Sequence, residues 1–178
     1  MAVASLREQP AGRNGRLLAS VSEPHRFLHT LNGMIVREIP EYEFVTMVYA
    51  VLDVFQLRLT ISAAGHPPPL RVPAGNGTAG KLELPPGMAL GLVPEARYTS
   101  TEVRLAPGDK LVFYTDGLTE TMNDRNEEFS EERLIELLRH HGGAPAPDVI
   151  ATICSAVNAF RGARAVTDDF SMLIAQIR

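Results

Sequence analysis

The sequence predicts an α+β fold with antiparallel sheets, because strand-like segments are grouped together and helical segments lie before and after them. Residues 44–54 and 57–66 are rich in β-branched and aromatic side chains, and only two residues separate them, which is typical of an antiparallel hairpin. Shorter strand patterns follow at residues 69–74, 81–84, 98–105 and 110–117. Because no helical pattern interrupts these segments, a doubly wound parallel sheet is disfavoured.

One helix is predicted before the strands. Ser22 can act as its N-cap and Pro24 suits its first turn. Apolar residues then recur at helical spacing until Pro40, where the pattern stops. Their spacing indicates a helix with a single apolar face.

Two helices and a final strand are predicted after the hairpin region. The first of these helices begins at Ser130, the expected N-cap, and ends at Gly142. The second covers residues 146–162, with apolar side chains on one side. Residues 170–177 form the last strand pattern, so the chain is expected to end in the sheet.

Composition limits the classes of function. The chain has 178 residues, of which 45% are hydrophobic, and a formal charge of -4, which fits one globular domain and disfavours nucleic acid as a partner. The single cysteine, Cys154, is expected in the core and indicates a reducing, cytoplasmic location. No apolar stretch approaches the roughly 20 residues of a membrane span, and no signal peptide is visible.

Three motif matches favour ordinary structural explanations. The glycines of residues 75–80 fit the spacing of a dinucleotide-binding loop, but no helix follows to receive a pyrophosphate. His140 and His141 stand at the predicted end of a helix, where a cation is favourable. His66, between a strand and a proline run, is expected to form a turn; a catalytic role is the less favoured alternative.

Acidic residues stand next to two predicted strands. Asp116 follows the apolar run at residues 111–114, and Asp168 and Asp169 directly precede the last strand. Carboxylates held at strand ends suit Mg²⁺ or Mn²⁺, which prefer oxygen ligands. Asp followed by Gly is also a common turn, and an acid pair can be a solvated loop. The spacing alone leaves both interpretations open.

Five blocks of sequence, taken in order, carry a family resemblance: FVTMVYAVLD, SAAGHPPPL, LPPGMALGL, LAPGDKLVFYTDGLTETMNDRNEEFSEERL and TDDFSMLI. Together they resemble the C-terminal part of the catalytic domain of bacterial SpoIIE/RsbU-type serine phosphatases, a branch of the PPM (PP2C-like) family. The resemblance implies an α/β/β/α sandwich of antiparallel sheets. Residues 1–178 are then expected to form one such domain that lacks its N-terminal strands, with residues 1–20 a remnant of its first helix and loop.

The resemblance also implies an activity. Members of the family hydrolyse phosphoserine or phosphothreonine on proteins with Mn²⁺ or Mg²⁺, and the substrate is often an anti-anti-sigma factor. Asp116 and Asp168 correspond to metal ligands, expected on the same ion, and Asp169 is expected to support them without binding the ion. A phosphorylated regulatory protein is the expected partner.

Two family blocks are missing from the sequence. Neither the early GGDxYD-like block nor the GDVSGHG-like block that carries a bridging acid occurs. The chain is therefore expected to be either a fragment of a longer phosphatase or a catalytically incomplete regulatory or binding module. Apolar surface left by the missing strands would favour pairing with another chain, including a homodimer. An aspartyl-phosphate hydrolase of the haloacid dehalogenase type is disfavoured, because Tyr114 occupies the position of its first Asp.

Overall fold

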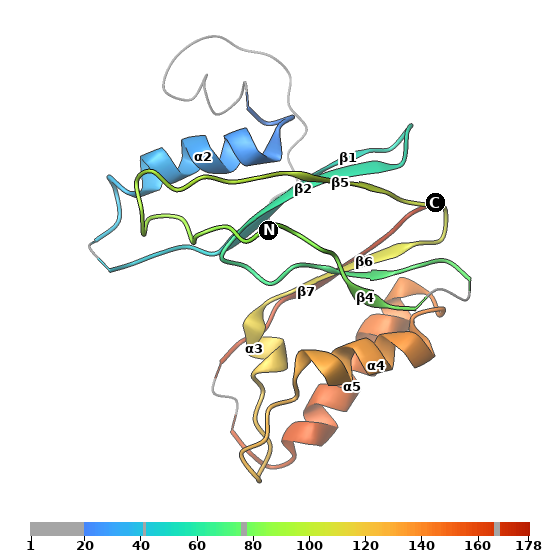
Figure 1. Ribbon diagram of the computed structural model, residues 1–178. Helices are drawn as coiled ribbons and strands as arrows, with labels where there is room; N and C mark the ends of the chain where they lie inside the picture. Colours follow the sequence, from blue (N-terminus) through green and yellow to red (C-terminus); the bar gives the residue numbers. More distant parts are fainter. Residues whose placement is uncertain (1–19, 41, 76–77, 166–167) are drawn as a thin grey trace. The chain divides into compact units, whose positions relative to one another are not determined.

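The computed structural model describes residues 20–40, 42–75, 78–165 and 168–178. Its contacts divide the chain into two compact units (Figure 1). Unit 1 comprises residues up to 51, 60–65 and 85–102, and unit 2 comprises residues 52–59, 66–84 and 103–178. The helix and loop expected for residues 1–20 lie outside the described residues, apart from Ser20.

Unit 1 contains a helix and most of a three-stranded sheet. The elements are α2 (Pro24–Ile35), β1 (Met47–Asp53), β2 (Arg58–Ala64) and β5 (Thr101–Arg104), with strand order β1-β2-β5. Leu28 of α2 is fully buried in a cluster with Ala64 and Leu90. The ring of Phe27 stacks on that of Tyr49 at a centroid distance of 4.0 Å. The apolar face predicted for this helix is thus the face that covers its core.

Two boundaries in unit 1 differ from the prediction. Glu23, not Ser22, occupies the N-cap of α2, because Pro24 already takes the first helical position. The hairpin connection between β1 and β2 covers residues 54–57 instead of two residues. Asp53 explains the longer turn, since its Oδ1 accepts hydrogen bonds from the backbone N–H of Phe55 and Gln56, both at 2.9 Å.

Unit 2 is built on a four-stranded antiparallel sheet in the order β4-β3-β6-β7. Its strands are β3 (Leu70–Val72), β4 (Gly80–Lys81), β6 (Lys110–Tyr114) and β7 (Met172–Gln176). In the antiparallel pair β6 and β7, Lys110 lies opposite Gln176 and Tyr114 opposite Met172. The C-terminal end of β6 therefore lies beside the N-terminal end of β7.

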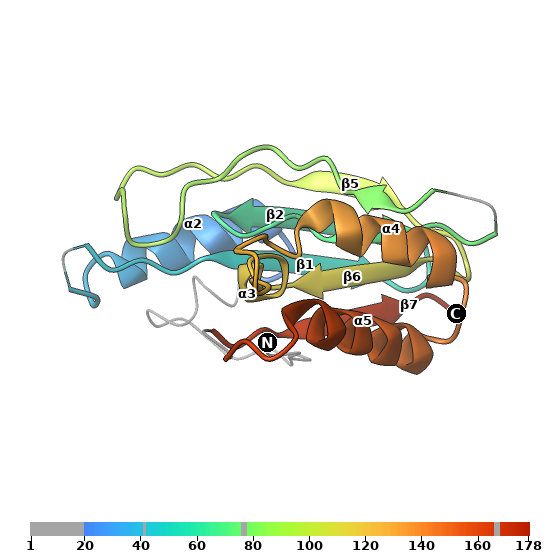
Figure 2. The same ribbon diagram turned by 90° about the horizontal axis from the view of Figure 1, so that it is seen from below.

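Two helices, α4 (Glu131–His141) and α5 (Ala146–Arg161), cover one face of this sheet (Figure 2). Their buried side chains and those of the sheet form one apolar core that includes Leu134, Leu138, Val149 and Ile153. Ser130 is the N-cap of α4 and Gly142 its C-cap, as predicted. Cys154 is only half-buried on α5, so it is not a core residue.

A short helix, α3 (Asp116–Thr119), follows β6 directly. The strand predicted for residues 110–117 therefore ends at Tyr114, and Asp116 begins a helical turn instead of ending a strand. The strand predicted at residues 81–84 shortens to Gly80–Lys81, and the glycine loop before it lies partly outside the described residues. None of the helices in the described parts is long and apolar enough to cross a membrane.

Candidate metal centre

The end of β6 positions Asp116. Thr115 connects the strand to α3, and its backbone N–H donates to the carbonyl of Ser171 at 3.0 Å. The N–H of Ser171 donates in return to Thr115 Oγ1 at 2.9 Å. These two bonds extend the β6–β7 pairing by one step and hold Asp116 at the edge of the sheet from which residues 168–171 enter β7.

Gly117 brings the two acidic segments into contact. A Cβ atom on Gly117 would lie 2.7 Å from the carbonyl oxygen of Asp169 and 3.6 Å from Oδ2 of Asp168. Only a residue without a side chain permits this approach of the two backbones. The glycine after Asp116 therefore does more than form a turn, since it lets the Asp168 carboxylate lie next to the first turn of α3.

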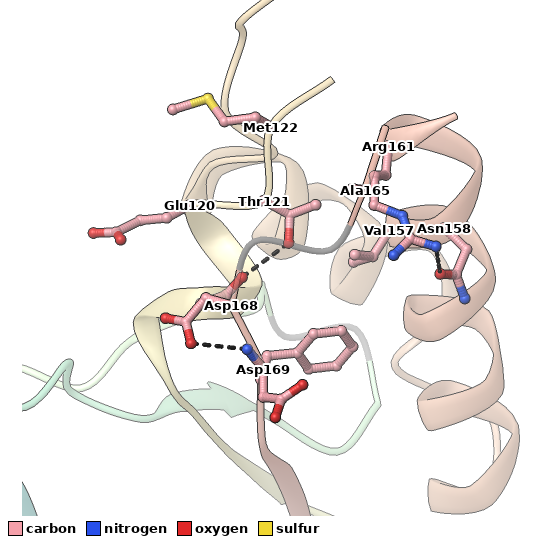
Figure 3. Close-up of a pocket in the computed structure, with 11 residues that line it drawn as sticks. Glu120, Thr121, Met122, Val157, Asn158, Arg161, Ala165, Asp168 and Asp169 are labelled. Atoms are coloured by element: carbon pink, nitrogen blue, oxygen red, sulfur yellow. Dashed lines mark hydrogen bonds between the residues drawn. The ribbon is translucent and has the colours of Figure 1, made fainter. Parts of the chain in front are cut away.

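Both carboxylates are exposed and are oriented by backbone donors. Oδ1 of Asp116 accepts a hydrogen bond from the N–H of Gly117 at 3.0 Å, and Oδ1 of Asp168 accepts one from the N–H of Asp169 at 2.8 Å. Asp169 thus contacts Asp168 through its backbone N–H, not through its own carboxylate (Figure 3).

These two acids fit a hydrated hard cation. Mg²⁺ is commonly bound by one or two carboxylates while it keeps several waters. Across the described ranges, no group of three or more His, Cys, Asp or Glu side chains is arranged to hold a metal ion. Asp116 and Asp168 would therefore offer two carboxylates to one ion.

A cavity of about 320 Å³ adjoins Asp168 and Asp169, whereas Asp116 is not among the residues that line it. Asp168, Asp169 and Gly117 line it together with polar side chains that the sequence did not single out: Glu120, Thr121, Asn158 and Arg161. Figure 3 shows Glu120, Thr121 and Asp168 on one side and the α5 residues Asn158 and Arg161 on the other. The one signal in the sequence was the spacing of Asn158 and Arg161, three apart at the end of a predicted helix.

His66 also belongs to this part of unit 2. It follows β2 at a bend, as the turn interpretation predicted. Burial lowers the pKa of its imidazole, while a hydrogen bond with the backbone of Tyr114 and the negative charge of Asp116 act in the opposite direction. Its proximity to Asp116 was not expected from the sequence.

The family follows from a comparison over nearly the whole chain. The family model "Stage II sporulation protein E (SpoIIE)" matches residues 8–178. The chain belongs to the SpoIIE family. The resemblance seen in the sequence is thereby confirmed.

A curated relative and two solved structures agree with this assignment. The chain is 25% identical over 151 residues to phosphoserine phosphatase RsbU of Bacillus subtilis. The aligned region covers 85% of this chain and 44% of the relative. The SiaA-PP2C domain of Pseudomonas aeruginosa superimposes with a TM-score of 0.76 at 19% identity, covering 93% of this chain and 68% of that one. The Mn-presoaked phosphatase domain of SpoIIE from Bacillus subtilis gives a TM-score of 0.67 at 13% identity, covering 98% and 77%.

The structural matches show the fold. The chain has the fold of PP2C phosphatase domains, with helices and antiparallel sheets, as predicted. It spans less than half the length of the curated relatives that it matches. The prediction that all 178 residues form a single domain remains a prediction.

Proposed function

We propose that this chain contributes to a metal-dependent protein serine/threonine phosphatase that hydrolyses phosphoserine or phosphothreonine on a regulatory protein. The observation that carries the proposal is the close approach of the segment that holds Asp116 to the segment that holds Asp168, which lines a cavity. Membership of the SpoIIE family and the similarity to a phosphoserine phosphatase support the substrate class.

Asp116 and Asp168 would hold one Mn²⁺ or Mg²⁺ ion. When bound, such an ion lowers the pKa of a coordinated water and neutralises charge on a phosphoryl group. The residues of this chain supply the orientation, because the N–H groups of Gly117 and Asp169 each fix one oxygen of the neighbouring carboxylate. Orienting contacts of this kind tune the affinity of a ligand set.

The partner is proposed from the family. A phosphorylated regulatory protein of the anti-anti-sigma-factor type would present its phosphoserine to the cavity beside Asp168. Homodimer formation and a cytoplasmic location, both expected from the sequence, remain predictions.

A second candidate function rests on the ligand count. Within the residues that the structure covers, no group of three or more His, Cys, Asp or Glu side chains could hold a metal ion. A two-metal phosphatase site needs ligands for both ions. The alternative is therefore a phosphatase-like regulatory or binding module that does not turn over substrate by itself.

Calorimetric titration with Mn²⁺, together with hydrolysis of a phosphoserine peptide in the same samples, tests the proposal. Asp116→Asn removes one carboxylate charge and should weaken Mn²⁺ binding at least about tenfold, since even changes to the partners of metal ligands cost 10–100-fold. Any peptide hydrolysis should be lost with it. Asp148→Asn is the matched control, because Asp148 is also an exposed Asp in the first turn of a helix.

The outcomes separate the two candidates. Mn²⁺ binding and hydrolysis that both fall in Asp116→Asn, and not in Asp148→Asn, support the phosphatase. Binding of Mn²⁺ without hydrolysis, or binding of a partner that survives the substitution, supports the non-catalytic module. Equal Mn²⁺ affinity in all three proteins would refute a metal role for Asp116.

A further inference from the structure

The cavity beside Asp168 has a polar wall on α5. Asn158 and Arg161 are three residues apart in the last two turns of this helix, so their side chains share one face. Both line the cavity whose other wall includes Glu120, Thr121 and Asp168 (Figure 3). The wall on α5 is therefore chemically unlike the acidic wall that it faces.

The guanidinium group of Arg161 is held in place but incompletely paired. Its Nη2 donates to Oδ1 of Asn158 at 3.2 Å. Its Nε is buried and has no hydrogen-bond partner among the residues that the structure describes. A buried N–H without an acceptor costs free energy, so this arrangement calls for an explanation.

Stabilisation of the helix end does not provide that explanation. A cation in the last turn of a helix is favourable, and Arg161 occupies such a position on α5. Arg139 has the same position on α4, where its Nη1 pairs with Glu136 at 3.2 Å and remains half-exposed. The interaction with a helix end can thus be made by an exposed arginine, and it does not require a buried N–H that lacks an acceptor.

We propose that Arg161, held by Asn158, binds the phosphoryl oxygens of a phosphoserine side chain in this cavity. Arg161 is the only cation among the described residues that line the cavity. A planar guanidinium matches the geometry of phosphate oxygens and binds them in a bidentate manner. A volume of about 320 Å³ accommodates a side chain of that size. Arg161 is then a substrate-binding residue on the wall opposite the carboxylates.

A phosphate bound in this cavity would need positive charge on both walls. A phosphate dianion beside Glu120, Asp168 and Asp169 would be repelled unless positive charge offsets these carboxylates. Arg161 supplies that charge on one side, and a cation held by Asp168 would supply it on the other. This inference rests on the proposed function, because it assigns the position of the substrate phosphate in the same site.

Calorimetric titration with inorganic phosphate and with a phosphoserine peptide, with and without Mg²⁺, tests the inference. The same peptide with unmodified serine shows whether binding requires the phosphate. Arg161→Gln should weaken binding of both phosphate probes about tenfold or more, because a lost charge-assisted hydrogen bond is worth at least that factor. Arg139→Gln is the matched control, since it also removes a last-turn arginine. Arg161→Lys keeps the charge at the helix end but loses the planar fork, and should fall between wild type and Arg161→Gln.

Several results would overturn the inference. One is equal phosphate affinity in wild type and Arg161→Gln. Another is no phosphate binding by wild type at millimolar concentration with Mg²⁺. The third is a loss of phosphate affinity in Arg139→Gln as large as that in Arg161→Gln. Mg²⁺ affinity and the circular dichroism spectrum should be unchanged in Arg161→Gln; if that variant does not fold, Arg161→Lys decides. Phosphate binding that depends on Arg161 without any hydrolysis would refute the phosphatase activity and leave this site in place. Hydrolysis with a KM that does not depend on Arg161 would support the phosphatase activity and refute the phosphate-binding role of Arg161.

Discussion

The two ends of strand β6 carry the same residue type in opposite environments. Asp109, directly before the strand, is 1% exposed, whereas Asp116, two residues after it, is exposed. Asp109 accepts hydrogen bonds from the Arg71 guanidinium and from the backbone N–H groups of Ala74 and Ala106. The carboxylate of Asp116 accepts one from the backbone N–H of Gly117. Both oxygens of the Asp109 carboxylate are thus bonded within the protein, whereas the Asp116 carboxylate is open to solvent.

The pKa of Asp109 reflects this commitment. Burial acts to raise the pKa of its carboxyl group, but the N–H groups of Ala74 and Ala106 and the Arg71 guanidinium outweigh burial and lower it below its usual value. Asp109 thus joins β3 to the turn before β6 as an ionised group. The hydrogen-bond donors around an aspartate at a strand end, and not its place in the sequence, therefore decide whether its carboxylate is tied into the fold.

Asp109→Ala should produce the largest loss of stability. It leaves Arg71 without its partner and two backbone N–H groups without an acceptor. Breaking a buried ion pair costs about 3–5 kcal/mol, and the low end, about 3, applies here because Arg71 remains partly exposed. Urea unfolding followed by circular dichroism measures the free energy of unfolding. A loss below about 1 kcal/mol, the size expected of an exposed pair, would show that the two ends of β6 do not differ as described.

Gly117→Ala should have the next largest effect and concerns the other end of the strand. The added methyl group would stand 2.7 Å from the carbonyl oxygen of Asp169, so the two acidic segments must separate. Overpacking of this kind costs about 1–3 kcal/mol, and Mn²⁺ affinity should fall although no carboxylate is removed. Urea unfolding and Mn²⁺ calorimetry measure the two effects.

Gly143→Ala is the control for Gly117→Ala, because a Cβ at Gly143 meets nothing within 4 Å. It tests whether any loss comes from the close approach and not from replacing a glycine as such. If Gly117→Ala retains wild-type stability and wild-type Mn²⁺ affinity, the contact of the two segments is not required.

A smaller effect is expected on the pH dependence of stability, because the stabilisation from Asp109 should be lost in acid. The pKa of Asp109 is lower in the folded protein than its unfolded value of about 3.9. The folded state therefore binds fewer protons, and the stabilisation from Asp109 is complete above the unfolded pKa and is lost as pH falls through the folded pKa. The difference in unfolding free energy between wild type and Asp109→Ala should be constant from pH 7 to about pH 5 and shrink below about pH 4. A difference that stays constant down to pH 2 would mean that the Asp109 pKa is not lowered.

Sequence patterns predicted the elements well where local chemistry decides them. Ser130 and Gly142 bound α4 as their residue types predicted, although the Ser130 side chain makes no cap hydrogen bond and Gly142 keeps a helical φ of -63°. Asp116 was placed on a strand, but it begins α3, since an apolar run does not reveal where the ladder to β7 stops. Periodicity could not bring Asp168 to Asp116 across some fifty residues; that expectation came from the family resemblance.

The cavity wall on α5 was missed for a related reason. Asn158 and Arg161 show helical spacing, which the sequence reveals, but the surface that they face depends on how α5 packs onto β7. Whether the Nε of Arg161 is paired can be seen only in three dimensions. Long-range packing, and not local preference, therefore sets most of this site.

Asp116→Asn should change stability least of all. Asp116 is exposed, and the hydrogen bond that its carboxylate accepts from the adjacent N–H of Gly117 can be accepted equally well by the amide oxygen of Asn. Substitutions at such positions usually stay within about 0.5 kcal/mol, so the free energy of unfolding without metal should match that of wild type. With excess Mn²⁺, wild type should gain stability through ligand binding and Asp116→Asn should gain less. A loss of 2 kcal/mol or more without metal would place Asp116 with Asp109 as a structural carboxylate, in the range of about 1–3 kcal/mol expected when a buried polar group loses its partner.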